Sequence, residues 1–309
     1  NVTAVRMHCS DRKEDKIMVG KQERRYQRMI TVVLALISLI MVIPLVLLVV
    51  ASFTSNNEIV LHGYSFFPKE LSLEAYRYIW NERAQVFHAY GITILVTAIG
   101  TTIGVMMTLL YAYVLAHETF LAFYLFFTML FNGGLVPTYI MYTRYLHMKN
   151  TIPALIIPGL LMSAFNVILT RTYIQSNVPA ALSEAAKIDG ATEFQVFRKV
   201  VLPMCKPIIA TVGLFAGLGY WNDWTNGLYY ITDTNKFSIQ QLLNNMIKNI
   251  EFLSKNANSN INLASVGGGI PQETVRMAIA IVGLLPILIV FPFVQKYFVK
   301  GISIGAVKG

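Results

Sequence analysis

Residues 29–53 read MITVVLALISLIMVIPLVLLVVASF and contain no charged side chain. About 20 such residues cross the hydrocarbon core of a bilayer, so this run predicts a membrane-spanning helix. A secretory signal peptide is the alternative for an early apolar run, but this one is too long, begins late and lacks a small-residue cleavage site. The composition agrees, because 55% of the 309 residues are hydrophobic and only 13% are charged, against about 25% charged residues in soluble domains.

Apolar runs of similar length recur along the chain and predict an all-α membrane protein with six transmembrane helices. The third run contains Asn132-Gly133-Gly134 and Pro137, so we expect it to be broken or tilted. Residues 29–309 are interpreted as one transmembrane domain, preceded by a tail at 1–28. The predicted spans are approximately 29–53, 90–116, 119–142, 152–174, 207–231 and 276–298.

Small residues four positions apart occur twice within these spans. They are Gly100 with Gly104 and Gly213 with Gly217. Such pairs allow helix backbones to approach closely. We therefore expect both pairs to lie at helix contacts.

The distribution of Lys and Arg predicts the orientation of the spans. With the N-terminus in the cytoplasm, most of the 25 Lys and Arg residues fall on the inner side, in segments 6–28, 171–206 and 296–308. Both termini are then cytoplasmic. The net charge of +9 follows largely from this topology, so it does not indicate a nucleic-acid partner.

Two long loops fall on the outer side. Segment 54–89 predicts a short surface helix that begins near Ser72, and residues 238–253 predict a second helix within 232–275. The polar run Asn256 to Asn262 and the triplet Gly267-Gly268-Gly269 predict a flexible loop.

Residues 177–206 form a charged insert between the fourth and fifth spans, on the cytoplasmic side. Asn177 is a candidate cap for a first helix, with Pro179 in its opening turn. Gly190 is placed to end this helix in a left-handed conformation, and Thr192 with Gln195 has the spacing of a capping box that starts a second helix. The pattern predicts a helix–glycine–helix elbow, and leaves open whether it rests on lipid headgroups or contacts a protein.

The spacing of the elbow residues is specific. Glu184-Ala185-Ala186 is followed after three residues by Gly190 and after nine more by Val200-x-Leu202-Pro203. This pattern resembles the EAA signature of ABC importer permeases, with Val200 in place of Ile. The stretches Asn132 to Tyr139, Asn150-Thr151, Ile156 to Pro158 and Tyr297 to Gly309 resemble the carbohydrate-uptake branch of that family, and in particular the second permease subunit of maltose-type and oligosaccharide systems.

The resemblance implies an importer-type permease fold and a set of partners. In the family, the elbow docks into a groove of an ATP-hydrolysing subunit. Glu184 and Asp189 would then be polar anchors, while Ala185, Ala186 and Gly190 would permit close approach. The implied partners are a second permease subunit, ATPase subunits, an extracellular substrate-binding lipoprotein and membrane lipid, in a bacterial plasma membrane.

A candidate substrate pathway lies in the fifth span, at Tyr220-Trp221-Asn222-Asp223-Trp224. Aromatic faces beside amide and carboxylate groups suit a sugar ring, and an acidic residue within a span usually faces a cavity or a partner. The alternative is an aromatic belt at the membrane interface, or a contact between subunits.

Other functions are less consistent with the sequence. No G-x-x-x-x-G-K-[ST] phosphate loop is present, so ATP and Mg²⁺ are expected on a partner, with no cofactor or metal in this chain. A secondary transporter of small polar solutes is the alternative function, but it needs a relay of intramembrane ionisable groups. We find no pattern typical of an intramembrane enzyme and expect a non-catalytic subunit.

Overall fold

The computed structural model describes the backbone of residues 2–117, 119–257 and 272–306, and the side chains of 25–116, 120–252 and 272–292. The regular elements of this part are helices, apart from one isolated antiparallel bridge between Thr54 and Leu71. The chain separates into two compact units, one formed by 1–75 with 273–278 and the other by 76–272 with 279–309. The residues of the predicted flexible loop from 258 to 271 lie outside the described residues, as do 307–309.

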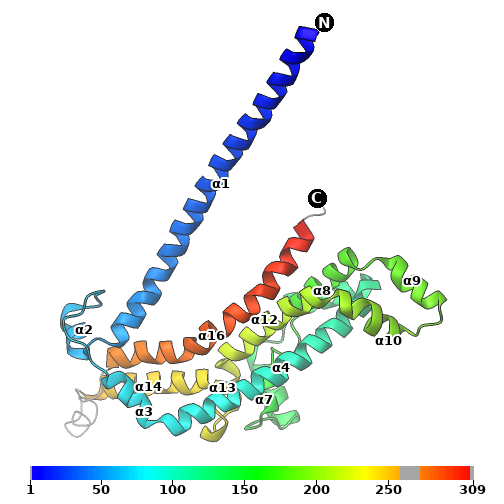
Figure 1. Cartoon of the computed structure of the whole chain (residues 1–309). Coiled ribbons are helices and arrows are strands. Elements are labelled where there is room, and N and C mark those ends of the chain that lie inside the picture. The colour runs from blue at the N-terminus through cyan, green and yellow to red at the C-terminus, as the bar shows by residue number, and fades with distance from the viewer. Residues whose placement is uncertain (1, 118, 258–271, 307–309) are drawn as a thin grey trace. The chain divides into compact units, whose positions relative to one another are not determined.

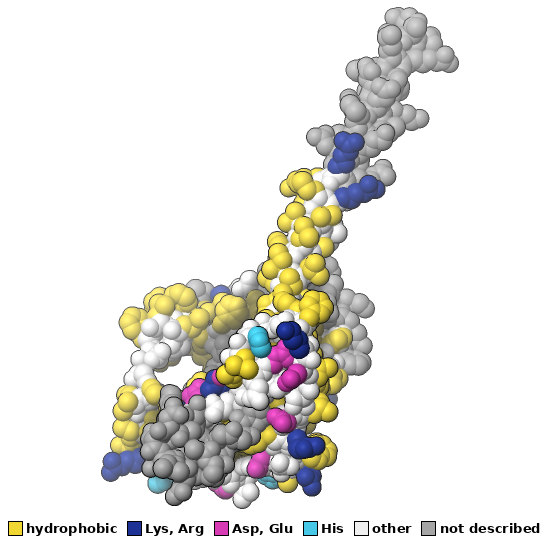
Figure 2. Space-filling view, turned by 90° about the vertical axis from the view of Figure 1, so that its left-hand side faces the viewer, with side chains coloured by type: hydrophobic (Ala, Val, Ile, Leu, Met, Phe, Trp, Pro, Cys, Tyr) yellow, Lys and Arg dark blue, Asp and Glu magenta, His cyan; other side chains and the backbone are white. Residues whose placement is uncertain are grey.

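The first unit contains α1 (Val2–Ser52) and α2 (Asn56–His62). Residues 25–52 of α1 are long and apolar enough to cross a membrane. Hydrophobic side chains cover much of the visible surface of this helix, and basic side chains lie beside the grey segment (Figure 2). The helix continues without a break into the predicted tail. After α2, the chain returns along itself, since the Glu58 carboxylate accepts the backbone N–H groups of Lys69 and Glu70 at 2.7 and 2.5 Å.

The second unit is organised around α4 (Arg83–His117), which lies beside α12 (Lys206–Asn222) and α8 (Ala164–Asn177) (Figure 1). A Cβ added at Gly100 would overlap the ring of Tyr220, and one at Gly104 would lie 2.8 Å from the carbonyl oxygen of Leu161. On α12, a Cβ at Gly217 would lie 3.6 Å from the Thr101 hydroxyl. The predicted helix contacts are therefore confirmed for Gly100 and Gly217, whereas Gly104 lies against the irregular chain at Leu161.

The third predicted span is broken, as expected. Its first half is α5 (Thr119–Leu130) and its second half is α6 (Leu135–Ile140), which continues into the π-helical turn η1 (Met141–Tyr145). The two halves meet at an angle of 105°. Gly134 occupies the corner with φ +79°, a conformation that glycine adopts without the strain that a side chain would add.

The fourth predicted span is not one helix, which corrects the expectation for 152–174. A single turn, α7 (Pro153–Ile156), is followed by irregular chain until α8 begins at Ala164. Pro158 lacks an amide hydrogen and Gly159 adopts φ +72°, so helical hydrogen bonding cannot continue through this point.

The fifth predicted span also breaks, because α12 ends at Asn222 and a short helix, α13 (Thr225–Tyr230), follows. The predicted outer helices are present as α3 (Glu74–Asn81) and α14 (Ile239–Ala257), with the 3-10 turn η3 (Thr234–Lys236) before α14. The last helix is α16 (Gln272–Ala306). Within the described residues, three helices are long and apolar enough to span a membrane, or up to five if each of two bent pairs counts as one span.

Candidate functional site

The predicted elbow is present and turns at Gly190. Its first helix is α9 (Ala180–Ile188), and Gly190 follows with φ +82°. The N–H of Gly190 donates to Lys187 O at 3.0 Å, and that of Ala191 donates to Ala186 O at 2.9 Å. These two bonds form a Schellman motif, in which carbonyl groups at the helix end receive hydrogen bonds that they would otherwise lack. The left-handed C-cap predicted at Gly190 is confirmed.

The second helix, α10 (Glu193–Val196), begins with the predicted capping box. The Thr192 N–H donates to the Gln195 side-chain oxygen at 2.9 Å, and the Gln195 N–H donates to the Thr192 hydroxyl at 3.4 Å. The helix continues through the π-helical turn η2 (Phe197–Val201) and α11 (Leu202–Met204). It then meets α12 at an angle of 81°, so the elbow runs directly into the fifth span.

One detail of the elbow differs from the sequence-based expectation. Asn177 does not cap α9, because it is the last residue of α8 and its side-chain amide donates to Tyr173 O at 3.1 Å. Val178 and Pro179 are extended, and α9 begins directly after them. The residue before a proline is disfavoured in the helical region. Val178 therefore ends α8, and Asn177 belongs to the end of α8 instead of the start of α9.

The predicted coupling residues lie together on the elbow. Glu184 and Ala185 on α9 are exposed, as are Asp189 and Gly190 at the turn, while Ala186 is half-buried. Apolar side chains that the motif does not include share this region, since Ile188 is 86% exposed and Phe194 is 65% exposed. Large apolar side chains held in water beside carboxylates are typical of a surface that a partner covers.

Residues that sequence reasoning missed link the two elbow helices to each other and to α4. Lys187 Nζ lies 2.5 Å from a Glu193 carboxylate oxygen, across the Gly190 turn. The other Glu193 oxygen accepts the Tyr113 hydroxyl of α4 at 2.8 Å. The Lys187 and Glu193 side chains are 46% and 64% exposed, so the pair adds little stability. Its consequence is geometric, because it connects both elbow helices to α4. The partners are distant in sequence, so no local pattern indicates them.

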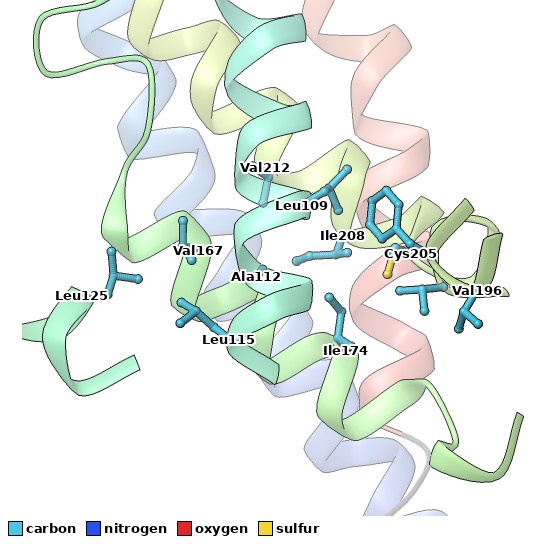
Figure 3. Packing of buried hydrophobic residues seen from close by; sticks show 12 residues of the cluster. Leu109, Ala112, Leu115, Leu125, Val167, Ile174, Val196, Cys205, Ile208 and Val212 are labelled. Atoms are coloured by element: carbon cyan, nitrogen blue, oxygen red, sulfur yellow. The ribbon is translucent and has the colours of Figure 1, made fainter. Parts of the chain in front are cut away.

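The inner face of the elbow packs into a buried cluster with α4, α8 and α12 (Figure 3). Val196 and Val201 are buried on the elbow side, and Phe197 contacts the Tyr113 ring at a centroid distance of 5.3 Å. Interiors of this kind are close-packed and transmit displacement. Movement of the elbow would therefore move α4, α8 and α12 together. The buried members of the cluster are Leu109, Ala112, Leu115, Leu125, Val167, Ile174, Val196, Phe197, Val201, Cys205, Ile208 and Val212.

Cys205 lies at the joint between the elbow and α12, and burial raises the pKa of its thiol to about 11. The thiolate is the reactive form of cysteine, and a pKa of about 11 instead of 9 lowers its fraction at pH 8 about 100-fold. In a Cys9→Ser variant, which leaves Cys205 as the remaining thiol, we therefore expect Cys205 to react with N-ethylmaleimide about 100-fold more slowly than an exposed thiol. The measurement is labelling rate by mass spectrometry in mild detergent, with a denatured sample as control. Equal rates in the two samples would contradict a closed joint.

The predicted pathway residues divide into two groups. Tyr220 is 2% exposed, and its hydroxyl donates to Ile156 O at 2.9 Å. One Asp223 carboxylate oxygen accepts the N–H groups of Thr225 and Asn226 at 3.1 and 3.3 Å, which caps α13. These contacts give Tyr220 and Asp223 structural roles at the break in the fifth span.

The other three residues lie beside two cavities. Trp221 lines an apolar cavity of about 350 Å³ between α12 and α16, and its indole N–H donates to Gly283 O at 3.4 Å. Asn222 and Trp224 line a second, more polar cavity of about 330 Å³. Within the described residues, no group of three or more His, Cys, Asp or Glu is arranged to hold a metal ion.

The described part of the chain is almost entirely helical, contains apolar helices of bilayer length, and has a charged elbow that leads into a bent span. These are features of a transport permease. Residues 17–304 match the family described as "Binding-protein-dependent transport system inner membrane component". The chain belongs to this family.

Curated relatives match over nearly their whole length. A polygalacturonan/rhamnogalacturonan transport system permease of Bacillus subtilis is 35% identical, over 93% of this chain and 100% of the relative. An arabinooligosaccharides transport system permease of Halalkalibacterium halodurans is 26% identical, over 91% and 96%.

A solved structure supports the fold. A chain in the crystal structure of a bacterial ABC transporter that imports the acidic polysaccharide alginate is 27% identical, covers 90% of this chain and 98% of its own length, and superposes with a TM-score of 0.69. The present chain is therefore an ABC transporter permease component with an importer-type fold.

Proposed function

We propose that this protein is one of two permease subunits of an ATP-driven importer for a carbohydrate, and specifically for an oligosaccharide. The observation that carries the proposal is the exposed elbow surface, in which Glu184, Asp189 and apolar side chains surround the Gly190 turn. The inner face of the same elbow packs against α4, α8 and α12. The names of the relatives, which transport polygalacturonan, rhamnogalacturonan and arabinooligosaccharides, support the cargo class.

The mechanism that we propose is alternating access driven by a partner. Two cytoplasmic ATPase subunits bind ATP and Mg²⁺, close, and displace the elbow. The displacement passes to α12 through the joint at Cys205 and to α4 through Glu193 and Tyr113. An extracellular binding protein delivers the sugar to the outer side. This chain holds no cofactor and catalyses no reaction.

The same proposal places the protein in a bacterial plasma membrane with both termini in the cytoplasm. The basic segments 6–28 and 171–206 support this orientation, because positively charged segments stay on the cytoplasmic side. The elbow then faces the ATPase, and the end of α12 at Asn222 lies toward the outer face.

Reconstitution tests the function directly. The chain is co-expressed with a second permease, an ATPase and a binding protein from the same genome, and the complex is placed in proteoliposomes. We expect ATP hydrolysis to rise several-fold with binding protein and oligosaccharide together, and uptake to require ATP. A complex lacking this chain is the control. Uptake driven by an ion gradient without ATP would instead favour a secondary transporter.

A further inference from the structure

The polar cavity of about 330 Å³ lies between the end of α12, α14 and the first half of α16. A volume of this size is at the lower end of small-ligand sites. Among its described lining residues are three amides and one indole, but no carboxylate. The lining is formed by Asn222, Trp224, Gln240, Leu243, Asn244, Ile247, Ile279, Ala280, Gly283, Leu284 and Ile287.

The amide groups are placed to bind a polar ligand. The Asn244 side-chain nitrogen is buried and has no hydrogen-bond partner among the described residues, and such a group costs free energy unless a ligand or water satisfies it. The Gln240 amide lies against α16 at Gly283, where a Cβ would be 3.6 Å from both of its amide atoms. The Asn222 amide nitrogen donates to Leu218 O at 2.9 Å, which leaves its carbonyl oxygen to accept.

Trp224 gives the cavity an apolar wall with a cation above it. The residue is 43% exposed, so part of it is accessible to a ligand. Lys248 Nζ lies 5.8 Å from the centroid of this ring, within the range of a cation–π contact. Lys248 follows Asn244 by one helical turn on α14, so the ammonium and the unsatisfied amide share one face of that helix.

The neighbouring charges favour an anionic ligand. Asp223, the carboxylate between Asn222 and Trp224, has one oxygen occupied by the N–H groups that cap α13. The carboxylate nearest to Lys248 in sequence is Glu251, three residues further along α14 and outside the lining of the cavity. The described lining of the cavity is uncharged, and the ammonium of Lys248 lies beside it, over the ring of Trp224. The indole offers a planar apolar surface for a sugar ring, the amides can hydrogen-bond to its hydroxyl groups, and the ammonium can pair with a carboxylate on the ring.

We infer that this cavity is a subsite for a uronate residue of the transported oligosaccharide, an inference that rests on the proposed function. The sugar ring stacks on Trp224, Asn244 and Gln240 bind its hydroxyl groups, and Lys248 binds its carboxylate. Lys248, Gln240 and Asn244 lie outside the 220–224 segment, so the subsite depends on the fold of α14 against α12 and α16.

The test measures uptake by the full complex in proteoliposomes, with trigalacturonate and the neutral galactotriose as probes. Lys248→Gln should lower trigalacturonate uptake about 10-fold at subsaturating sugar and leave galactotriose uptake unchanged. Lys248→Arg should restore acidic-sugar uptake, because it returns the charge. Asn244→Leu should lower uptake of both sugars. The matched control is Asn249→Leu, which changes an amide of α14 that lines a different cavity.

The outcomes separate the subsite from the function. Equal uptake of trigalacturonate by the parent and by Lys248→Gln would overturn the subsite, as would a parent complex that imports only the neutral sugar, and in both cases the importer function would stand. A parent complex that imports no carbohydrate would overturn both. Loss of both sugars in Lys248→Gln with normal amounts of complex would also overturn the assigned carboxylate contact.

Discussion

Glu184→Lys should abolish coupling between the ATPase and this permease. The carboxylate is exposed on α9, beside the small residues Ala185 and Ala186 that let a partner approach. Reversing a charge that becomes buried in an interface costs roughly 2 kcal/mol or more, which is about 30-fold in affinity. We expect the ATPase to be lost on co-purification and uptake to fall to background.

The measurement is the amount of ATPase retained by the tagged permease, together with uptake in proteoliposomes. Glu70→Lys is the matched control, because Glu70 is also an exposed carboxylate but lies in the first unit, outside the elbow. It should retain the ATPase at the parent level. Normal ATPase retention and uptake in Glu184→Lys would remove the elbow from the proposed docking surface.

Gly100→Val should destabilise the contact between α4 and α12. A Cβ at this position overlaps the Tyr220 ring, and Tyr220 cannot move without giving up its hydrogen bond to Ile156 O. Overpacking of a closed site costs typically 1–3 kcal/mol, and the lost hydrogen bond adds about 1 kcal/mol. We expect a fall of several degrees in the melting temperature of the detergent-solubilised complex.

Gly91→Val is the control, since a Cβ at Gly91 on the same helix has nothing within 4 Å. It should melt close to the parent. A double-mutant cycle with Gly100→Ala and Tyr220→Ala tests the same contact. The double variant should lose less stability than the sum of the losses in the two single variants. Independent effects would mean that the two residues are not in contact.

Local patterns were sufficient for the elbow turn, because its determinants are close in sequence. The left-handed glycine at 190 and the capping box of Thr192 with Gln195 each satisfy backbone groups within a few residues. The same reasoning failed at Asn177, where two possible helix ends compete. The backbone restriction that Pro179 places on Val178 decided the outcome in favour of α8.

Hydropathy predicted where the chain is apolar, but not where its helices stop. The run 152–174 is mostly apolar and carries one charged residue, Arg171, near its end, yet the break around Pro158 and Gly159 divides it. Asp223 was notable as an acidic residue in an apolar run, and its observed contact is a helix cap that depends on the break after Asn222. A window average cannot register such breaks, because it gives equal weight to each position.

By itself, the sequence determined the membrane class, the Gly190 elbow and the family of this protein, since these depend on apolar length and on spacing over about 20 residues. Only the tertiary structure decided that Glu193 joins Lys187 to Tyr113, and that Asn244 and Lys248 meet Trp224 beside one cavity. Such sites combine side chains from helices far apart in the chain. Their geometry follows from helix packing, which no local pattern records.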